Sequence, residues 1–195
     1  MATPADALTK SQAARRQRVL VAALHLGAEG GYDAVHMRDV AASAEVALGT
    51  IYRYFPSKDA LLAAAMVEWM EDLERRVTMR APLGETTAER VHDVLRRAVA
   101  TMERQPKLAE AVITALTSDD REAGGASAAT TEVMQRVMLR AFPEDADPVT
   151  EAAVAKVLGH VWFSCLVAWS NGVGDLRWVG DELETACHLL CDHLG

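Results

Sequence analysis

Apolar residues recur at intervals of three and four along most of this 195-residue chain. That spacing places them on one face of an α-helix, whereas a half-buried strand has them at every second position. Alanine and leucine, both strong helix formers, account for 35 and 20 residues, while isoleucine occurs only twice. The chain is therefore predicted to be all-α, with no strand.

Glycine, proline and capping residues divide the pattern into about nine predicted helices. Ser11 is a suitable cap for the first helix, and Gly30-Gly31 ends it. Phe55-Pro56 separates the third helix from the fourth, Asp147-Pro148 opens the eighth, and the glycine-containing segment 118–127 is predicted to be a loop. The helices are expected at about 11–29, 37–44, 48–54, 58–80, 87–104, 106–116, 129–141, 148–170 and 181–194.

Charge is distributed unevenly along the chain. The formal net charge is −8, which by itself argues against a nucleic-acid partner because like charges repel. Residues 1–60, however, carry seven Lys and Arg against six Asp and Glu, whereas residues 61–195 carry thirteen against twenty-two. The acidic total therefore belongs to the larger C-terminal part, and the N-terminal part remains compatible with DNA.

Several other functional classes find no support in the sequence. The longest apolar stretch, Val161 to Trp169, is short of the roughly 20 residues that cross a bilayer, and no leader pattern begins the chain. Three cysteines form no disulfide framework. There is no phosphate-binding glycine loop, no Gly-x-Ser-x-Gly and no His-Glu-x-x-His. We expect a cytoplasmic protein that is not an enzyme and uses no cofactor, metal or membrane.

The segment 37–58 carries the sharpest functional signal. It predicts two helices of about two turns each, which are too short to be stable alone and need a shared core. Val40, Ala44, Ile51 and Phe55 are among the residues that supply it. A pair of short helices joined by a tight turn is the arrangement of a helix-turn-helix, whose second helix enters the major groove of DNA.

The second of these helices has a surface suited to DNA. Thr50, Tyr52, Arg53 and Tyr54 crowd hydrogen-bonding and aromatic groups into five residues, and Gly49 lets the backbone approach a phosphate. For Tyr52 and Tyr54, the alternative to DNA contact is ordinary packing within the protein. The basic residues that begin the first helix have two readings as well, phosphate contact or a solvated face, and they are Lys10, Arg15, Arg16 and Arg18.

The run Gly-Thr-Ile-Tyr-Arg-Tyr-Phe-Pro-Ser-Lys at 49–58 resembles the DNA-binding signature of TetR-type transcriptional repressors. Gly30-Gly31-Tyr32 and Met37-Arg38-Asp39-Val40-Ala41 fit the same pattern. The resemblance implies a tail over 1–10, a helix-turn-helix domain over 11–57, and a ligand-binding and dimerisation domain over 58–195. The DNA contacts that it implies, together with those expected from the residues, are Met37, Arg38, Leu48, Gly49, Thr50, Tyr52, Arg53, Tyr54 and Lys58.

Two residues depart from that signature. Glu45 stands where a glycine is frequent in the turn, so it must adopt a left-handed backbone at some cost. Ala47 stands where a serine often caps the second helix, which removes about 1 kcal/mol of capping. Both departures affect local stability rather than the fold.

A narrower resemblance links the chain to the TetR subgroup that represses sterol and cholesterol catabolism. It rests on residues 35–56 and on Val-Trp-Phe-Ser-Cys-Leu-Val-Ala-Trp at 161–169. Members of that subgroup respond to bulky steroid acyl-CoA thioesters. The resemblance therefore implies a large hydrophobic effector.

Ligand and dimer contacts are expected among apolar residues, with core packing as the alternative for each. Flexible methionines suit an adaptable pocket, and the proposed lining is Met66, Trp69, Met70, Met102, Met134, Met138, Phe142 and Trp162. The last two long helices are expected to form an intermolecular four-helix bundle through Val157, Val161, Cys165, Leu183, Ala186, Cys187 and Leu190. Cys187, His188, Cys191 and His193 suggest zinc, but on one helix they do not converge.

Together these patterns predict a cytoplasmic, homodimeric repressor that binds a palindromic double-stranded DNA operator. A small hydrophobic effector would release it by favouring a dimer geometry that no longer matches the operator half-sites. The competing class is an all-α carrier or enzyme without a DNA role.

Overall fold

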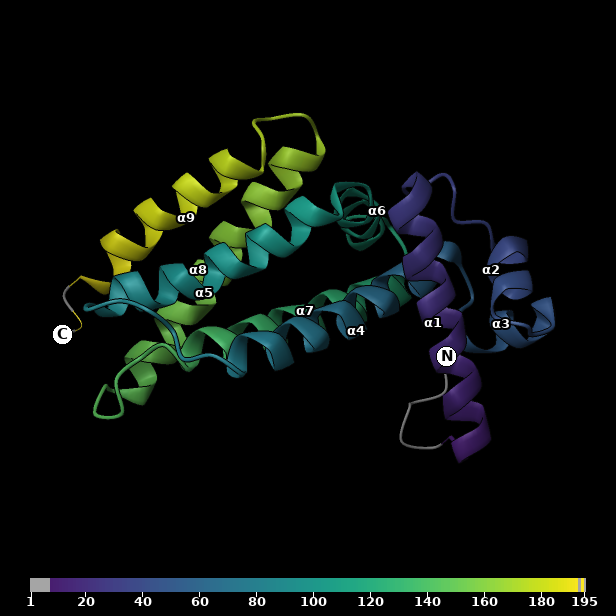
Figure 1. Ribbon diagram of the computed structural model, residues 1–195, viewed down its shortest axis with the longest axis horizontal. Helices are drawn as coiled ribbons and strands as arrows, with labels where there is room; N and C mark the ends of the chain where they lie inside the picture. The colour runs from purple at the N-terminus through teal and green to yellow at the C-terminus, as the bar shows by residue number, and fades with distance from the viewer. Residues whose placement is uncertain (1–7, 193, 195) are drawn as a thin grey trace. The chain divides into compact units, whose positions relative to one another are not determined.

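The computed structural model describes residues 8–192 and 194, and within this range it leaves out the side chains of 77, 78, 121–124 and 127. Seven residues of the predicted tail, 1–7, lie outside the described part. The all-α prediction is confirmed, since the described residues form nine helices and no strand (Figure 1). The helices are α1 Lys10–Gly30, α2 Met37–Ser43, α3 Leu48–Tyr54, α4 Lys58–Thr78, α5 Thr87–Arg104, α6 Pro106–Leu116, α7 Arg121–Leu139, α8 Pro148–Ser170 and α9 Leu176–Cys191.

Three helices begin earlier than predicted. Thr9, rather than Ser11, caps α1, because the Thr9 and Gln12 side chains bond each other's backbone N–H groups in a capping box. Asp175 caps α9 by accepting a hydrogen bond from the Trp178 N–H at 2.9 Å, so the helix begins at Leu176, five residues before the predicted start. The predicted loop over 118–127 is wrong from Arg121 onward, where α7 begins.

The contacts divide the chain into two compact units. The first unit consists of Met1–Trp69 and Gln105–Ala129, and the second consists of Met70–Arg104 and Thr130–Gly195. Helices α4 and α7 each begin in the first unit and end in the second. The helix-turn-helix therefore shares its unit with α6, which sequence reasoning assigned to the regulatory domain.

In the first unit, α1 packs against α2, α3 and α6. Leu20, Val40 and Ile51 are fully buried and bring α1, α2 and α3 together. The approach of α6 to α1 is close, because a Cβ added at Gly27 would lie 3.0 Å from Cδ1 of Leu108. A larger residue at this point of α1 would require the Leu108 side chain to shift.

In the second unit, α9 packs against both α5 and α8. The core includes Leu95 of α5, Leu158 of α8, and Val179 and Leu183 of α9, all fully buried. Asp147 caps α8 through the Thr150 N–H at 3.0 Å, as the Asp-Pro pair predicts. Both long C-terminal helices thus begin at an aspartate cap.

Helix α8 has an unusually apolar surface. Among the described residues it is the helix whose length and composition alone would allow it to cross a membrane. Counting only unbroken apolar stretches missed this, because its polar residues are few and scattered. Only 33% of its most apolar 18-residue window is buried within the chain. The rest of that window is half-buried or exposed in the chain.

Candidate nucleic-acid interface

Helices α2 and α3 form a helix-turn-helix beside α1 (Figure 1). Each has seven residues, about two turns. Val40 and Ala41 of α2 and Ile51 and Tyr54 of α3 are buried. The pair depends on this shared core, because neither helix is long enough to be stable in isolation.

The turn between α2 and α3 shows both expected departures. Glu45 has a φ of 52°, the left-handed region that a glycine would occupy with less strain. The turn is nevertheless closed by the Val46 N–H, which donates to the Ala41 carbonyl at 3.0 Å. Ala47 precedes α3 and offers no side-chain cap. Helix α3 therefore begins without the side-chain hydrogen bond that a serine at this position could supply.

The predicted DNA residues of α3 lie on its outer surface with one exception. Tyr52 is 50% exposed and Arg53 is exposed, while Leu48 and Thr50 are half-buried. No atom lies within 4 Å of a Cβ added at Gly49, so the backbone there is open to a large partner. The outer surface of α3 thus offers a guanidinium, two hydroxyls and an accessible backbone.

Tyr54 is the exception. Its side chain is only 4% exposed, and its hydroxyl donates to the Gln12 carbonyl at 3.5 Å while accepting from Nη2 of Arg53 at 3.3 Å. It joins α3 to α1 from inside the unit. The periodicity could have shown this, since Tyr54 follows Ile51 by three positions on the same helical face.

Lys58 and Arg38 flank α3 on neighbouring elements. Arg38 is exposed on α2. The ammonium of Lys58 lies 3.5 Å from the centroid of the Tyr32 ring and donates to the Tyr32 carbonyl at 3.2 Å. The Tyr32 hydroxyl in turn donates to Oδ1 of Asp59 at 2.5 Å. Burial and the bonded, negatively charged Asp59 raise the pKa of Tyr32 to about 12, so this hydroxyl stays protonated.

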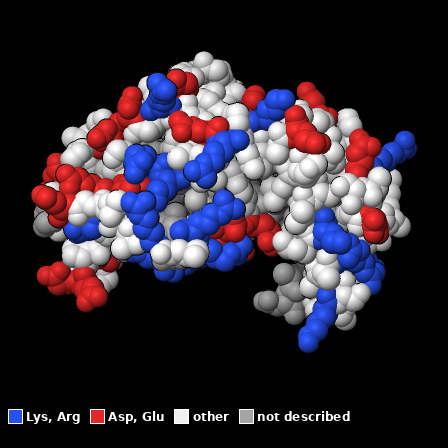
Figure 2. Space-filling view, in the orientation of Figure 1, with Lys and Arg blue, Asp and Glu red and all other residues white. Residues whose placement is uncertain are grey.

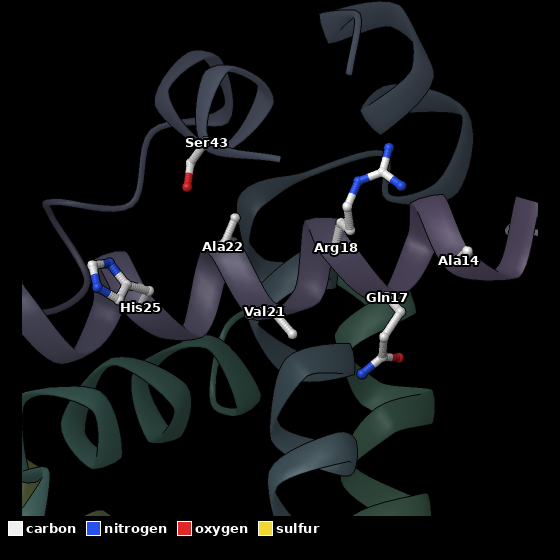
Figure 3. Close-up of a pocket in the computed structure, with 7 residues that line it drawn as sticks. All are labelled: Ala14, Gln17, Arg18, Val21, Ala22, His25 and Ser43. Carbon is white, nitrogen blue, oxygen red and sulfur yellow. The ribbon is translucent and has the colours of Figure 1, made fainter. Parts of the chain in front are cut away.

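Two of the basic residues of α1, Arg16 and Arg18, are engaged within the first unit. Nε of Arg18 donates to the Ala44 carbonyl at 3.1 Å, and Arg16 lies 5.3 Å from the centroid of the Phe55 ring. These contacts hold the helix-turn-helix to α1, a role that sequence reasoning missed. A cavity of about 580 Å³ opens next to them, with Ser43 of α2 facing α1 (Figure 3). Its lining consists of Ala14, Gln17, Arg18, Val21, Ala22, His25 and Ser43.

The residues proposed to line a ligand pocket fall in both units. Met66 and Trp69 belong to the first unit, and the other six belong to the second. Trp69 is half-buried, and the remaining residues are buried: Met66, Met70, Met102, Met134, Met138, Phe142 and Trp162. Burial of this kind fits core packing as well as it fits a pocket.

The residues proposed for a dimer interface divide by exposure. Val157 is 45% exposed, and Val161, Ala186 and Leu190 are half-buried. Cys165, Leu183 and Cys187 are buried inside the second unit instead, so they support α8 and α9 from within. Burial is also the main cause that raises the pKa of Cys187 to about 12, which leaves an unreactive thiol.

The zinc alternative gains nothing from the described residues. They contain no group of three or more His, Cys, Asp or Glu placed to hold a metal ion. His188 points to Asp192, with Nδ1 and Oδ1 at 3.1 Å, while His193 lies outside the described residues.

In the second unit, two arginines lie beside a buried carboxylate. Asp93 of α5 is only 6% exposed, accepts from the Leu83 N–H at 3.0 Å, and pairs with Arg96 and Arg97. Arg97 also donates to the carbonyls of Arg80 and Ala81, both at 3.0 Å. Figure 2 shows Lys and Arg side chains gathered over α5 and the C-terminal part of α4. This cluster fastens the loop after α4 to α5.

Comparison with known proteins matches both parts of the chain to one group. The family described as bacterial regulatory proteins, tetR family, matches residues 19–65. The family described as tetracyclin repressor-like, C-terminal domain, matches residues 84–190. Similar proteins include two called HTH-type transcriptional repressor KstR. The one from Rhodococcus jostii is 37% identical over 95% of this chain and 86% of its own length. The one from Mycolicibacterium smegmatis is 34% identical over 93% and 89%.

Solved structures show the same fold. A TetR transcriptional regulator from Rhodococcus sp. RHA1 has a TM-score of 0.77 and 31% identity, covering 93% of this chain and 97% of that one. FadR from Thermus thermophilus, a TetR family transcriptional repressor in complex with lauroyl-CoA, has a TM-score of 0.68 and 22% identity, covering 90% and 92%.

Proposed function

This chain belongs to the TetR family of bacterial transcriptional regulators, and on that premise we propose that it represses transcription by binding a palindromic operator as a homodimer. Members of the family are not enzymes, so the alternative of an all-α enzyme is set aside. The place of action would be the cytoplasm, where the DNA is. The functional boundaries that we propose remain 11–57 for DNA binding and 58–195 for ligand binding and dimerisation.

The exposed surface of α3 carries the DNA-binding part of the proposal. Tyr52 and Arg53 face solvent beside an open backbone at Gly49, on a helix whose opposite side is buried. Arg53 would contact phosphate or a guanine edge, and Thr50 and Tyr52 would contact thymine methyl groups. Tyr54 is reassigned from DNA contact to support of α3.

A mobility shift with DNA from upstream of the protein's own gene tests this part. We expect Arg53→Ala to weaken binding at least tenfold and to reduce its dependence on salt, because one phosphate or base contact is lost. Arg177→Ala, which removes an exposed arginine from α9, is the matched control and should bind as the wild type does. Equal binding by the two variants would show that α3 does not read DNA.

The apolar surface of α8 supports the proposed homodimer. Only 33% of its most apolar window is buried within the chain, and Val157 lies exposed there. Pairing α8 and α9 with the same helices of a second copy would cover this surface in a four-helix bundle. Val157→Glu should convert the dimer to a monomer in light scattering, whereas Val21→Glu, at an exposed valine of α1, should leave it dimeric. A monomeric wild type would contradict the proposal.

The effector that we propose is a small hydrophobic molecule, with a steroid acyl-CoA thioester as the first candidate. The Trp162–Trp169 element and the KstR relatives favour this class, and FadR, which has the same fold, is in complex with lauroyl-CoA. Titrating a steroid acyl-CoA into the protein–DNA complex should release the DNA, while free coenzyme A should not. A complex that is unchanged by the thioester would exclude this class.

A further inference from the structure

The residues that precede α4 and α7 are joined by a hydrogen bond. The hydroxyl of Ser57 donates to Oδ2 of Asp120 at 2.5 Å, across 63 positions of the chain. Ser57 stands immediately before α4 and also accepts a hydrogen bond from the Ala60 N–H at 2.9 Å, which caps that helix. Asp120 stands immediately before α7. One bond thus ties together the starts of the two helices that pass from the first unit into the second.

This tie lies directly behind the recognition helix. Only Phe55 and Pro56 separate the end of α3 from Ser57, and the backbone of both residues is restricted. Phe55 is 4% exposed, and its N–H donates to the Ile51 carbonyl at 2.8 Å. The ring of Pro56 fixes its own φ. A displacement of Ser57 would therefore reach α3 without being absorbed in between.

Two other contacts at the start of α4 come from the helix-turn-helix segment itself. Lys58 and Asp59 both bond Tyr32, which precedes α2. Asp120 differs from them because it lies within residues 84–190, the part matched by the C-terminal family. Two further contacts from that part, Lys107 to the Glu29 carbonyl and Leu108 against Gly27, reach α1 instead.

We propose that Asp120 is a positioning residue for operator binding, which sets the orientation of α3 through its hydrogen bond to Ser57. The inference rests on the proposed function of α3 as the DNA reader. It adds Asp120, a residue of the C-terminal part that does not contact DNA but determines the orientation of α3 toward the DNA. A change in α7 would reach α3 by this route.

Whether Asp120→Ala weakens or strengthens DNA binding distinguishes this positioning role from a simple effect of charge. Asp120→Ala removes a negative charge, which by itself favours binding to polyanionic DNA. We expect the variant to bind a labelled duplex of its own upstream DNA about tenfold more weakly, because α3 loses its orientation. Asp119→Ala is the matched control, since it removes the same charge from an exposed neighbour, and it should bind as tightly as the wild type or slightly more tightly.

Two further variants test the bond itself. Asp120→Asn keeps an acceptor oxygen for the Ser57 hydroxyl and should restore operator affinity to within about threefold of the wild type. Ser57→Ala also removes the cap of α4, so it should weaken binding at least as much as Asp120→Ala does. The double variant should bind no more weakly than Ser57→Ala alone, because the bond between the two residues is already lost in the single variant. Losses that multiply in the double variant, or an Asp120→Ala variant that equals Asp119→Ala, would overturn the proposal.

Amide hydrogen exchange of the free protein distinguishes failure of this inference from failure of the proposed function. In the free protein, Asp120→Ala should speed exchange in α3 and leave α9 unchanged, and this result does not depend on whether the protein binds the duplex. Unchanged exchange in α3 would overturn the positioning role. A wild type that does not bind the duplex, with α3 exchange still dependent on Asp120, would overturn only the operator assignment.

Discussion

The helix pair α2–α3 and the helix pair α8–α9 are stabilised in opposite ways. Helices α2 and α3 have seven residues each, and neither His36 nor Ala47 caps them with a side chain. Helices α8 and α9 have 23 and 16 residues, and Asp147 and Asp175 cap them. The first pair has to obtain its stability from neighbouring elements, whereas the second pair has much of it built in.

This difference teaches where the protein is open to control. A helix whose stability comes from its neighbours changes when those neighbours move, so the DNA-reading pair responds to α1, to the start of α4 and to Asp120. A helix with its own cap and length transmits movement without melting. The stability of α2 and α3 thus depends on neighbouring elements, whereas α8 and α9 depend less on theirs.

The largest expected effect comes from removing the core on which α2 and α3 rely. Ile51 is fully buried, so Ile51→Ala should cost about 2–4 kcal/mol of unfolding free energy, measured by urea denaturation. Leu183→Ala, equally buried in α9, should cost a similar amount overall. Only Ile51→Ala should selectively speed amide exchange in α2 and α3. Equal exchange in the two variants would remove the contrast between the pairs.

Asp93 shows that the second unit also depends on a long-range polar contact. Burial raises the pKa of Asp93, but the Leu83 N–H and the two arginines outweigh it, so the pKa lies below its ordinary value. This contribution to stability is present above the unfolded pKa of about 4 and is lost as the pH falls through the lower folded pKa. Asp93→Asn should cost about 2 kcal/mol at pH 7, because Arg97 loses its charged partner and keeps only the carbonyls of Arg80 and Ala81.

Thermal unfolding followed from pH 7 to pH 2.5 checks this prediction. The melting temperature of Asp93→Asn should fall less steeply below pH 4 than that of the wild type. Asp119→Asn, at an exposed aspartate, serves as the control and should follow the wild-type curve. Parallel curves for wild type and Asp93→Asn would show that the pKa of Asp93 is the same in the folded and the unfolded chain, which would contradict the lowered folded pKa.

Adding a cap to α3 and removing the cap of α8 should change the free energy of unfolding by about 1 kcal/mol in opposite directions. Ala47→Ser supplies the missing cap of α3 and should stabilise the protein. Asp147→Ala removes the cap of α8 and should destabilise it. Calorimetry measures both, and an unchanged melting temperature for Ala47→Ser would mean that the start of α3 is already satisfied by its neighbours.

The smallest effect concerns the turn. Glu45→Gly should relieve the left-handed backbone at φ 52° and raise stability by about 0.5 kcal/mol, since the flexibility gained by the unfolded chain offsets part of the relief. Glu45→Ala keeps the strain and serves as the control. If glycine is no more stable than alanine, the left-handed conformation at this residue costs nothing.

The sequence predicted the helix-turn-helix well because its signal is local. Helical spacing, the Gly30-Gly31 stop and the run 49–58 lie within 30 residues and identify α1, α2 and α3. The strain at Glu45 and the missing cap at Ala47 followed from the same local pattern and were confirmed.

What the sequence did not predict depends on contacts between distant residues. The bond between Ser57 and Asp120 spans 63 positions, and nothing in either segment indicates the other. Periodicity identified an apolar face on α9 but could not tell whether Leu183 meets its own chain or a second copy, and the structure buries it within the chain. The start of α9 was missed because the cap at Asp175 comes directly after the chain-breaking Gly174.

The uncovered surface of α8 has a consequence for how the protein behaves on dilution. If a second copy covers that surface, unfolding and dissociation are linked, so the melting temperature should rise with protein concentration. The number of copies per cell would then influence the fraction of folded, paired repressor. If a cell contains few copies of the protein, its concentration would lie close to the value at which the two copies of the dimer dissociate.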